Sequence, residues 1–403
     1  MTISRLIVPS ALLCLLCATL TGCSAVSKST ETTFDPGTMQ AIARNEAYSP
    51  HLYSLPAPTQ AISAEPPQTS DKENAIIRTY FATNRQFTGK SLPYEAFGAE
   101  DSKVTYGVAD VSIPRDHRLG EFEGPWLGIR MLESKKKHIM LMGVETLDQQ
   151  ALFELITQKV AETKGKSALV FVHGYTVSFE DAARRTAQLS YDLGFEGAPI
   201  FYSWPSNESV PKYGDDEHVI ERSTPMFKAF LEDVFKRTGA ENVYLVAHSM
   251  GNRAMASAMA ALIDDAQVHA KVRRLIFTAP DVDAAEFEGK LAPPLVAAGV
   301  PVTVYASSKD VALLASKQVH HRKRRLGDTR GDISIVKGIE TIDASAVKTD
   351  FLGHSYFAEN GSVVSDIFYL FRTDLRPGER FNMKGLEVAK GRYWAFQPGL
   401  CKP

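Results

Sequence analysis

The sequence is short of cysteine, of excess charge and of long apolar segments. It has 4 cysteines in 403 residues, too few for a disulfide-stabilised scaffold. Its 45 Lys and Arg residues nearly balance 47 Asp and Glu residues, so the net charge of −2 gives no reason to expect a nucleic-acid partner. No spaced set of Cys and His residues suggests a metal, and no glycine-rich phosphate loop follows a predicted strand, so we expect no cofactor. The remaining composition, with 44% hydrophobic residues, is that of a globular protein with a full core.

The most conspicuous apolar run lies at the N-terminus. It covers Leu6 to Leu20 after Arg5, which is too short for an ordinary membrane-spanning helix and fits the core of a secretory signal. The run ends in Leu20-Thr21-Gly22-Cys23, which resembles the bacterial lipoprotein box. That resemblance implies a signal peptide over residues 1–22, lipidation of Cys23 and a place in the bacterial envelope; Ser24 favours, by analogy, the periplasmic side of the outer membrane. The alternative is an ordinary cleaved signal in which Cys23 is incidental.

The rest of the chain divides into a tether and one large domain. Residues 23–74 are rich in Ser, Thr, Pro, Ala and Glu without a sustained apolar period, which predicts a flexible tether. Three β-rich runs follow, and from about residue 148 short apolar strands alternate with helices. We therefore expect an α/β domain over residues 75–380, followed by a C-terminal extension over 381–403. The domain should have a mostly parallel central sheet with helices on both faces and an antiparallel β-rich N-terminal lead-in.

Two helix starts are predicted from local signals. Ser178, with Asp181 three residues later, is placed to cap a helix. A second helix is predicted over Thr224 to Thr238, in which Pro225 takes the tolerated first turn.

The strongest chemical signal is the segment Val243 to Gly251, with the sequence VYLVAHSMG. An apolar strand runs into His248-Ser249-Met250 and a helix follows at once, as a nucleophile elbow requires. The residues two before and two after the serine must be small, because the backbones approach closely there. Gly251 meets this need, and Ala247 is small enough although the usual pattern has glycine. We therefore predict that Ser249 is a nucleophile.

A serine hydroxyl needs a base to take its proton, and in this context the chain order is serine, acid, histidine. His354 lies in a glycine-containing loop after the last predicted strand, and we take it as the base. Asp310 follows the strand after next from the serine strand and is the preferred acid. Asp281 and Asp283 follow the intervening strand and stay open as alternatives.

Acyl transfer also needs an oxyanion hole made of two backbone N–H groups aimed at one point. One N–H is expected from Met250, directly after the nucleophile. The other is expected from Tyr175, because His173-Gly174-Tyr175 follows a short apolar strand and Gly174 permits a sharp bend.

Six short segments together resemble one protein family. They are Thr79–Arg85 (TYFATNR), Phe171–Tyr175 (FVHGY), Tyr202–Pro205 (YSWP), Ala247–Gly251 (AHSMG), Ala279–Asp281 (APD) and Gly353–Ser355 (GHS). The family is an uncharacterised bacterial α/β-hydrolase family with an esterase- or lipase-like description, and the resemblance covers roughly residues 75–375. It implies the α/β-hydrolase fold and a serine hydrolase that uses Ser249, His354 and the His-Gly turn. Asn84 and Arg85 are expected to brace the sheet edge or the rim of the active site, with a structural role preferred.

The residues and the resemblance together predict a hydrolase of carboxylic esters that acts through an acyl-enzyme. The expected partners are a small-molecule or lipid ester and the membrane that holds the lipid anchor; the sequence names no protein partner. The competing hypothesis is a non-catalytic envelope lipoprotein that uses the same fold for binding or scaffolding.

Overall fold

The computed structural model describes residues 74–124, 133–207, 212–319, 323–347 and 361–397. The predicted signal peptide, Cys23, almost all of the predicted tether and His354 lie outside these described residues. Within these ranges, none of the helices has the length and hydropathy of a membrane span.

One eleven-stranded sheet organises the domain, in the order β10-β11-β9-β8-β7-β6-β4-β5-β1-β2-β3. Its middle runs parallel from β1 to β11, and antiparallel strands flank it on both sides. β1 pairs antiparallel with β2 but parallel with β5, so the N-terminal lead-in is part of the central sheet. The strands are β1 (Asn74–Phe87), β2 (Phe97–Pro114), β3 (Met140–Leu147), β4 (Ser167–Val172), β5 (Ala198–Ser203), β6 (Asn242–His248), β7 (Val272–Thr278), β8 (Val302–Ala306), β9 (Glu340–Asp343), β10 (Met383–Val388) and β11 (Gly391–Phe396).

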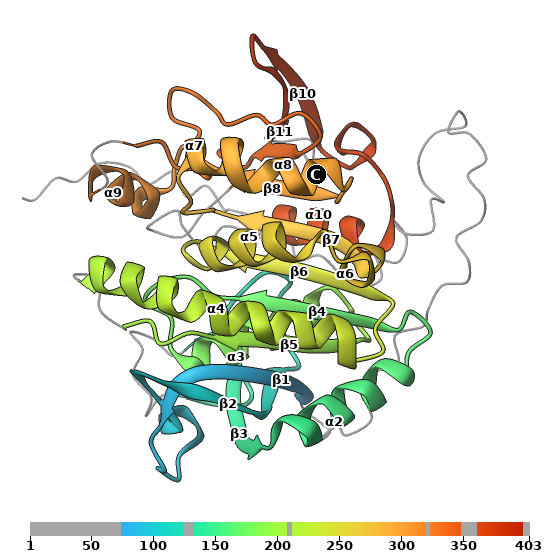
Figure 1. The fold of residues 1–403 in the computed structure, drawn as a ribbon. Helices are drawn as coiled ribbons and strands as arrows, with labels where there is room; N and C mark the ends of the chain where they lie inside the picture. The colour runs from blue at the N-terminus through green and yellow to red at the C-terminus, as the bar shows by residue number, and fades with distance from the viewer. Residues whose placement is uncertain (1–73, 125–132, 208–211, 320–322, 348–360, 398–403) are drawn as a thin grey trace, which may run out of the picture. The chain divides into compact units, whose positions relative to one another are not determined.

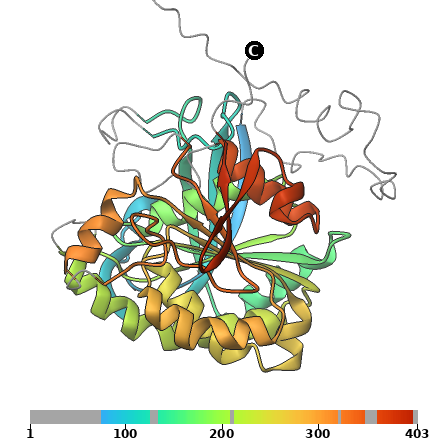
Figure 2. The same cartoon turned by 90° about the horizontal axis from the view of Figure 1, so that it is seen from above.

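Helices cover both faces of this sheet, as the alternating pattern predicts (Figures 1 and 2). One face carries α2 (Gln149–Ala161), α4 (Tyr213–Arg237), α5 (Gly251–Leu262), α6 (Ala266–Lys271) and α8 (Ala292–Ala297). The other face carries α3 (Phe179–Asp192) and α10 (Gly361–Arg372). Helices α7 (Ala284–Glu286) and α9 (Val311–Val319) follow β7 and β8. The predicted fold class is confirmed.

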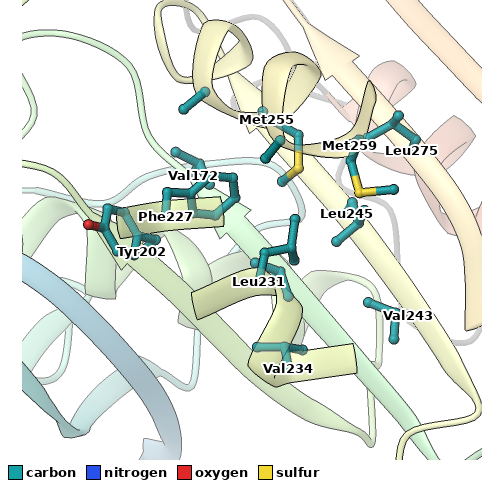
Figure 3. Close-up of a cluster of buried hydrophobic side chains, with 14 of the residues drawn as sticks. Val172, Tyr202, Phe227, Leu231, Val234, Val243, Leu245, Met255, Met259 and Leu275 are labelled. Atoms are coloured by element: carbon teal, nitrogen blue, oxygen red, sulfur yellow. The ribbon is translucent and has the colours of Figure 1, made fainter. Parts of the chain in front are cut away.

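The larger core lies between the sheet and the helices α4 and α5 (Figure 3). Leu245 of β6 and Met259 of α5 are fully buried there, as are Phe227 and Leu231 of α4. Each such side chain stabilises the fold by about 1.5–3 kcal/mol relative to an exposed position. This packing holds the serine strand β6 and the helix after it in one rigid unit.

The helix α4 begins earlier than its sequence predicts. Pro225 lies inside the helix and not in its first turn, so the predicted start at Thr224 is wrong. The local rule fails because the buried face of α4 extends from Asp216 and Ile220 to Phe235, across the proline. Thr224 Oγ1 donates to the Ile220 carbonyl at 2.8 Å, one turn back along the same helix.

The segment predicted as a C-terminal extension contributes two strands to the sheet. β10 and β11 form an antiparallel hairpin, and β11 pairs in parallel with β9 through Trp394 and Ile342. Residues 383–396 therefore complete one edge of the sheet.

A buried imidazole fixes the loop before residue 125 to helix α3. His117 Nδ1 lies 2.7 Å from Glu123 Oε2, and His117 Nε2 lies 2.7 Å from Asp192 Oδ1 at the end of α3. A carboxylate only accepts hydrogen bonds, so both ring nitrogens carry protons and the ring is an imidazolium. Burial alone would lower the pKa of His117, but the bonds to Asp192 and Glu123 outweigh it and raise the pKa to about 9.

This contact predicts a pH-dependent stability. The folded state holds the proton of His117 more tightly than the unfolded chain, whose pKa is 6.5, so the contribution is complete below pH 6.5 and is lost as pH rises toward 9. We expect wild type to lose up to about 3 kcal/mol of unfolding free energy over that interval relative to His117→Gln. Urea unfolding of both proteins at pH 6, 7.5 and 9 measures their unfolding free energies. A difference between wild type and His117→Gln that stays the same at all three pH values would contradict the prediction.

Candidate active site

Ser249 occupies the sharp corner between β6 and α5. Its φ of 53° lies in the left-handed region, which a non-glycine residue adopts only when its surroundings enforce it. Three bonds do so: the Ser249 N–H donates to the Thr278 carbonyl at 3.0 Å, and the Ser249 carbonyl accepts from the N–H groups of Asn252 at 3.1 Å and Asp281 at 3.2 Å. The Asn252 side chain donates to the same carbonyl at 2.8 Å. This is the backbone geometry of the predicted elbow.

Two glycines let the turns after β4 and β6 touch. A Cβ on Gly174 would lie 2.7 Å from Ser249 Cβ and 3.2 Å from Ser249 Oγ. A Cβ on Gly251 would lie 2.4 Å from the His173 carbonyl oxygen. All three distances are shorter than van der Waals contact, so the serine and the His173-Gly174 turn approach closely only because these two positions lack side chains.

The N–H groups predicted for the oxyanion hole lie on these two turns. Met250 is the residue before α5, whose N-terminal end favours negative charge. No turn, loop or cap hydrogen bond within the described residues uses the Met250 N–H. Tyr175 follows Gly174 on the facing turn.

Backbone strain is concentrated at this edge of the sheet. Five non-glycine residues in the described ranges have a left-handed φ, and three of them follow the carboxyl ends of the adjacent strands β4, β6 and β7. They are Thr176 at 54°, Ser249 at 53° and Ala279 at 47°. Each such residue costs about 1–3 kcal/mol, and strain of this kind gathers at functional sites.

Of the candidate acids, Asp281 is occupied by structural contacts. Its Oδ1 accepts from Ser316 Oγ at 2.6 Å, and its Oδ2 accepts from the Tyr213 hydroxyl. Arg253 Nη2 lies 3.5 Å from Oδ2, and Arg325 Nε lies 3.4 Å from Oδ1. Burial would raise the pKa of Asp281, but the two arginines and the two hydroxyls outweigh it and hold the pKa below its ordinary value.

The other two aspartates sit at helix starts. Asp283 Oδ1 accepts from the N–H groups of Ala285 and Glu286, so it caps α7. Asp310 is fully buried after β8, and its Oδ1 accepts from the Leu313 N–H at 2.9 Å at the start of α9. The Asp310 backbone carbonyl accepts from Arg330 at 2.7 Å.

The side chain of Tyr175 lies within the electrostatic reach of both buried acids, Asp281 and Asp310. Burial raises the pKa of Tyr175, and the negative charges of Asp281, Asp310 and Asp216 raise it further. Its ring packs edge-on against Tyr213 of α4, with 5.3 Å between ring centroids. The loops after β4, β7 and β8 therefore share one electrostatic environment.

The structure thus places most of the predicted site residues at the carboxyl ends of adjacent parallel strands. It brings Ser249 together with the His173-Gly174 turn, while the Asp281 carboxylate is held by Arg253 and Arg325. Sequence reasoning missed Tyr213 and Arg253, the partners of Asp281. Arg253 lies four residues after Ser249 on α5, but no sequence motif marks either residue.

A family model described as "Alpha/beta hydrolase of unknown function (DUF900)" matches residues 148–372, more than half of the chain. The chain belongs to this family. The predicted α/β-hydrolase fold is thereby confirmed, and family membership supports hydrolase activity without defining the bond that reacts. The match begins after β3, so β1 to β3 lie outside it. No curated protein matches the chain.

Several solved hydrolases are distantly similar. A predicted CIB-like hydrolase from Thermoplasma acidophilum is 13% identical, with 74% of this chain and 99% of that chain covered and a TM-score of 0.34. Est1E from Butyrivibrio proteoclasticus is 14% identical, with coverages of 51% and 86% and a TM-score of 0.31. Phospholipase PlaB from Legionella pneumophila is 10% identical, with coverages of 57% and 68% and a TM-score of 0.34. Likeness this distant says nothing about the substrate.

Proposed function

We propose that the protein is a serine hydrolase that cleaves carboxylic esters through an acyl-enzyme. The observation that carries the proposal is the left-handed Ser249 at the β6–α5 corner, in contact with the glycine turn after β4. This combination supports a nucleophile because it places the Ser249 hydroxyl between two backbone turns that can supply N–H groups.

In the proposed reaction, Ser249 Oγ attacks the ester carbonyl carbon while a base takes the hydroxyl proton. The carbonyl oxygen becomes an oxyanion, which accepts from the N–H groups of Met250 and Tyr175. The base returns the proton to the leaving alcohol as the ester C–O bond breaks. Water, activated by the same base, then releases the carboxylic acid and restores the serine.

We assign the base to His354, on its place in the sequence between β9 and α10. The geometry of His173, the histidine of the facing turn, supports this assignment by excluding that one competitor. His173 Nδ1 lies 2.7 Å from the Gly174 carbonyl oxygen and Nε2 lies 3.1 Å from Ser203 Oγ. Burial and then the charge of Arg85 lower the pKa of His173 to about 3, which leaves it unsuited to accept a proton at neutral pH.

We assign the acid to Asp310. The contacts of Asp281 support this choice, because both of its carboxylate oxygens already serve Arg253, Arg325 and two hydroxyls. Asp310 follows β8, the strand after next from the serine strand in the sheet. Its carboxylate would hold the imidazole tautomer and stabilise the imidazolium formed during the reaction.

We also propose that Cys23 carries a lipid that anchors the enzyme to the bacterial envelope, on the periplasmic side of the outer membrane. The support is the sequence Leu20-Thr21-Gly22-Cys23-Ser24 after an apolar run. The tether over residues 23–74 would then separate the catalytic domain from the membrane, and small-molecule or lipid esters near that membrane would be the substrates.

Replacement of the nucleophile tests the proposed reaction. Ser249→Ala should lower the kcat for p-nitrophenyl butyrate by about 10⁴-fold or more and abolish labelling by a fluorophosphonate probe, because the substitution removes the attacking hydroxyl. Ser223→Ala removes an equally buried serine on α4 and should leave both readouts unchanged. A folded wild type that neither reacts with the probe nor hydrolyses esters would favour the scaffold hypothesis.

Two isosteric substitutions distinguish the acids. Asp310→Asn should lower kcat by about 10⁴-fold with little change in Tm, because the amide cannot stabilise the imidazolium. Asp281→Asn should keep kcat within about tenfold but lower the unfolding free energy by about 3 kcal/mol, since the buried Arg325 loses the carboxylate charge that faces it. Kinetics and thermal melts of both variants measure this; the reverse pattern would move the acid to Asp281.

The anchor has its own test. In cells fed a clickable palmitate analogue, wild type should incorporate the label and fractionate with outer membranes, whereas Cys23→Ala should do neither, because only the thiol can carry the lipid. Cys401→Ala serves as the matched control and should behave as wild type. Incorporation that survives Cys23→Ala would refute the anchor and leave the hydrolase proposal untouched.

A further inference from the structure

Arg85, at the end of β1, is a fully buried arginine outside the family match. Its guanidinium donates to three backbone carbonyls: Val177 at 2.5 Å, Gly98 at 3.1 Å and Ser206 at 3.3 Å. Its Nε donates to Ser203 Oγ at 2.9 Å. A buried charge is costly unless hydrogen bonds compensate it, so four donated bonds to fixed oxygens make Arg85 a rigid support.

Two of these acceptors belong to segments that contact the candidate active site. Val177 ends the turn that begins with His173, and the Ser203 hydroxyl lies 3.1 Å from His173 Nε2. Arg85 therefore holds both ends of this turn by hydrogen bonds. It donates directly to the Val177 carbonyl, and it contacts His173 indirectly through the Ser203 hydroxyl. Between them lies Thr176, whose left-handed φ of 54° must be held by its surroundings.

The hydrogen bonds assign the protons of His173. A carbonyl oxygen only accepts, so the Nδ1 that lies 2.7 Å from the Gly174 carbonyl carries the ring proton. Nε2 is then the acceptor and receives the Ser203 hydroxyl proton, which leaves the serine oxygen to accept from Arg85. Burial and the charge of Arg85 oppose a second proton on the ring, so the imidazole is neutral with one fixed tautomer.

That tautomer fixes a peptide plane beside the nucleophile. The Gly174 carbonyl is held by His173 Nδ1, and in a planar trans peptide the Tyr175 N–H points the opposite way. The preceding carbonyl, that of His173, is held by the indole N–H of Trp204 at 2.8 Å, with the two rings stacked at 11°. Gly174 itself lies against Ser249.

We propose that Arg85 is a positioning residue for the oxyanion hole: through Ser203 and His173 it sets the direction of the Tyr175 N–H. The inference rests on the proposed serine-hydrolase function and adds a residue that the family match does not include. Arg85 touches no reacting atom. It acts by fixing a donor before the substrate arrives, and such preorganisation lowers the barrier without a change in ground-state binding.

Arg85→Lys tests the proposal while it keeps the charge. A single ammonium cannot reach Val177 and Ser203 together in the fork geometry of a guanidinium. Removal of one oxyanion donor costs about 10²–10³-fold in kcat, so a donor that is present but misaligned should cost about 10–100-fold, with KM changed less than about threefold. The same loss should appear in the rate of fluorophosphonate labelling. The buried Arg274 donates to the carbonyls of Leu370 and Thr373 and provides a matched control. Arg274→Lys should lower the Tm but keep the wild-type kcat.

A second pair of variants keeps the test decisive if Arg85→Lys does not fold. His173→Asn retains an amide N–H near the place of Nδ1 and should keep most of the wild-type kcat. His173→Ala removes the donor, so its kcat should fall about as far as that of Arg85→Lys. Equal kcat values for His173→Asn and His173→Ala, or a folded Arg85→Lys with wild-type kcat, would overturn the proposal. If wild type itself matches Ser249→Ala, the proposed function has failed and not only the role of Arg85.

Discussion

The contact between two turns, one after β4 and one after β6, is the constraint on which the candidate site depends. Gly174 lies against the side chain of Ser249, and Gly251 lies against the carbonyl of His173. Protein interiors are close-packed, so a single methyl group at either position would push the turns apart. The left-handed conformation of Ser249 persists because this packing and the bonds from β7 and α5 leave the chain no other path.

Buried polar networks hold this contact from both sides. On the β5 side, Arg85 and Ser203 support His173. On the β7 side, Arg253 donates through Nε to the backbone carbonyl of Asp281 at 2.7 Å, and the Asp281 N–H donates to the carbonyl of Ser249. Buried networks of this kind rigidify a structure when each member has its partners. The nucleophile thus sits between two polar supports and above a large apolar core.

How far the sequence predicts this structure depends on how local each feature is. The elbow could be predicted because its strand, serine and helix are contiguous, and the Ser178 cap is confirmed by the 3.0 Å bond from the Asp181 N–H. The start of α4 was predicted wrongly because burial of a long apolar face overrides the preference of Pro225. The structural role of Asp281 depends on Tyr213, 68 residues away, and Arg85 is separated from Ser203 by 118. No periodicity or spacing rule connects residues so distant.

The position of β1 has a consequence for how the domain is assembled. β1 lies between β2, its antiparallel neighbour, and β5, whose Ser203 pairs with Thr83 across 120 residues. Contacts so far apart in sequence slow folding, because the chain loses the entropy of closing a long loop before the strand pairing stabilises it. Until β5 is in place, the β1–β2 ribbon presents an open edge on which another chain can add a strand. The outer edge of β1 is therefore protected only once β5, more than a hundred residues later, has paired with it.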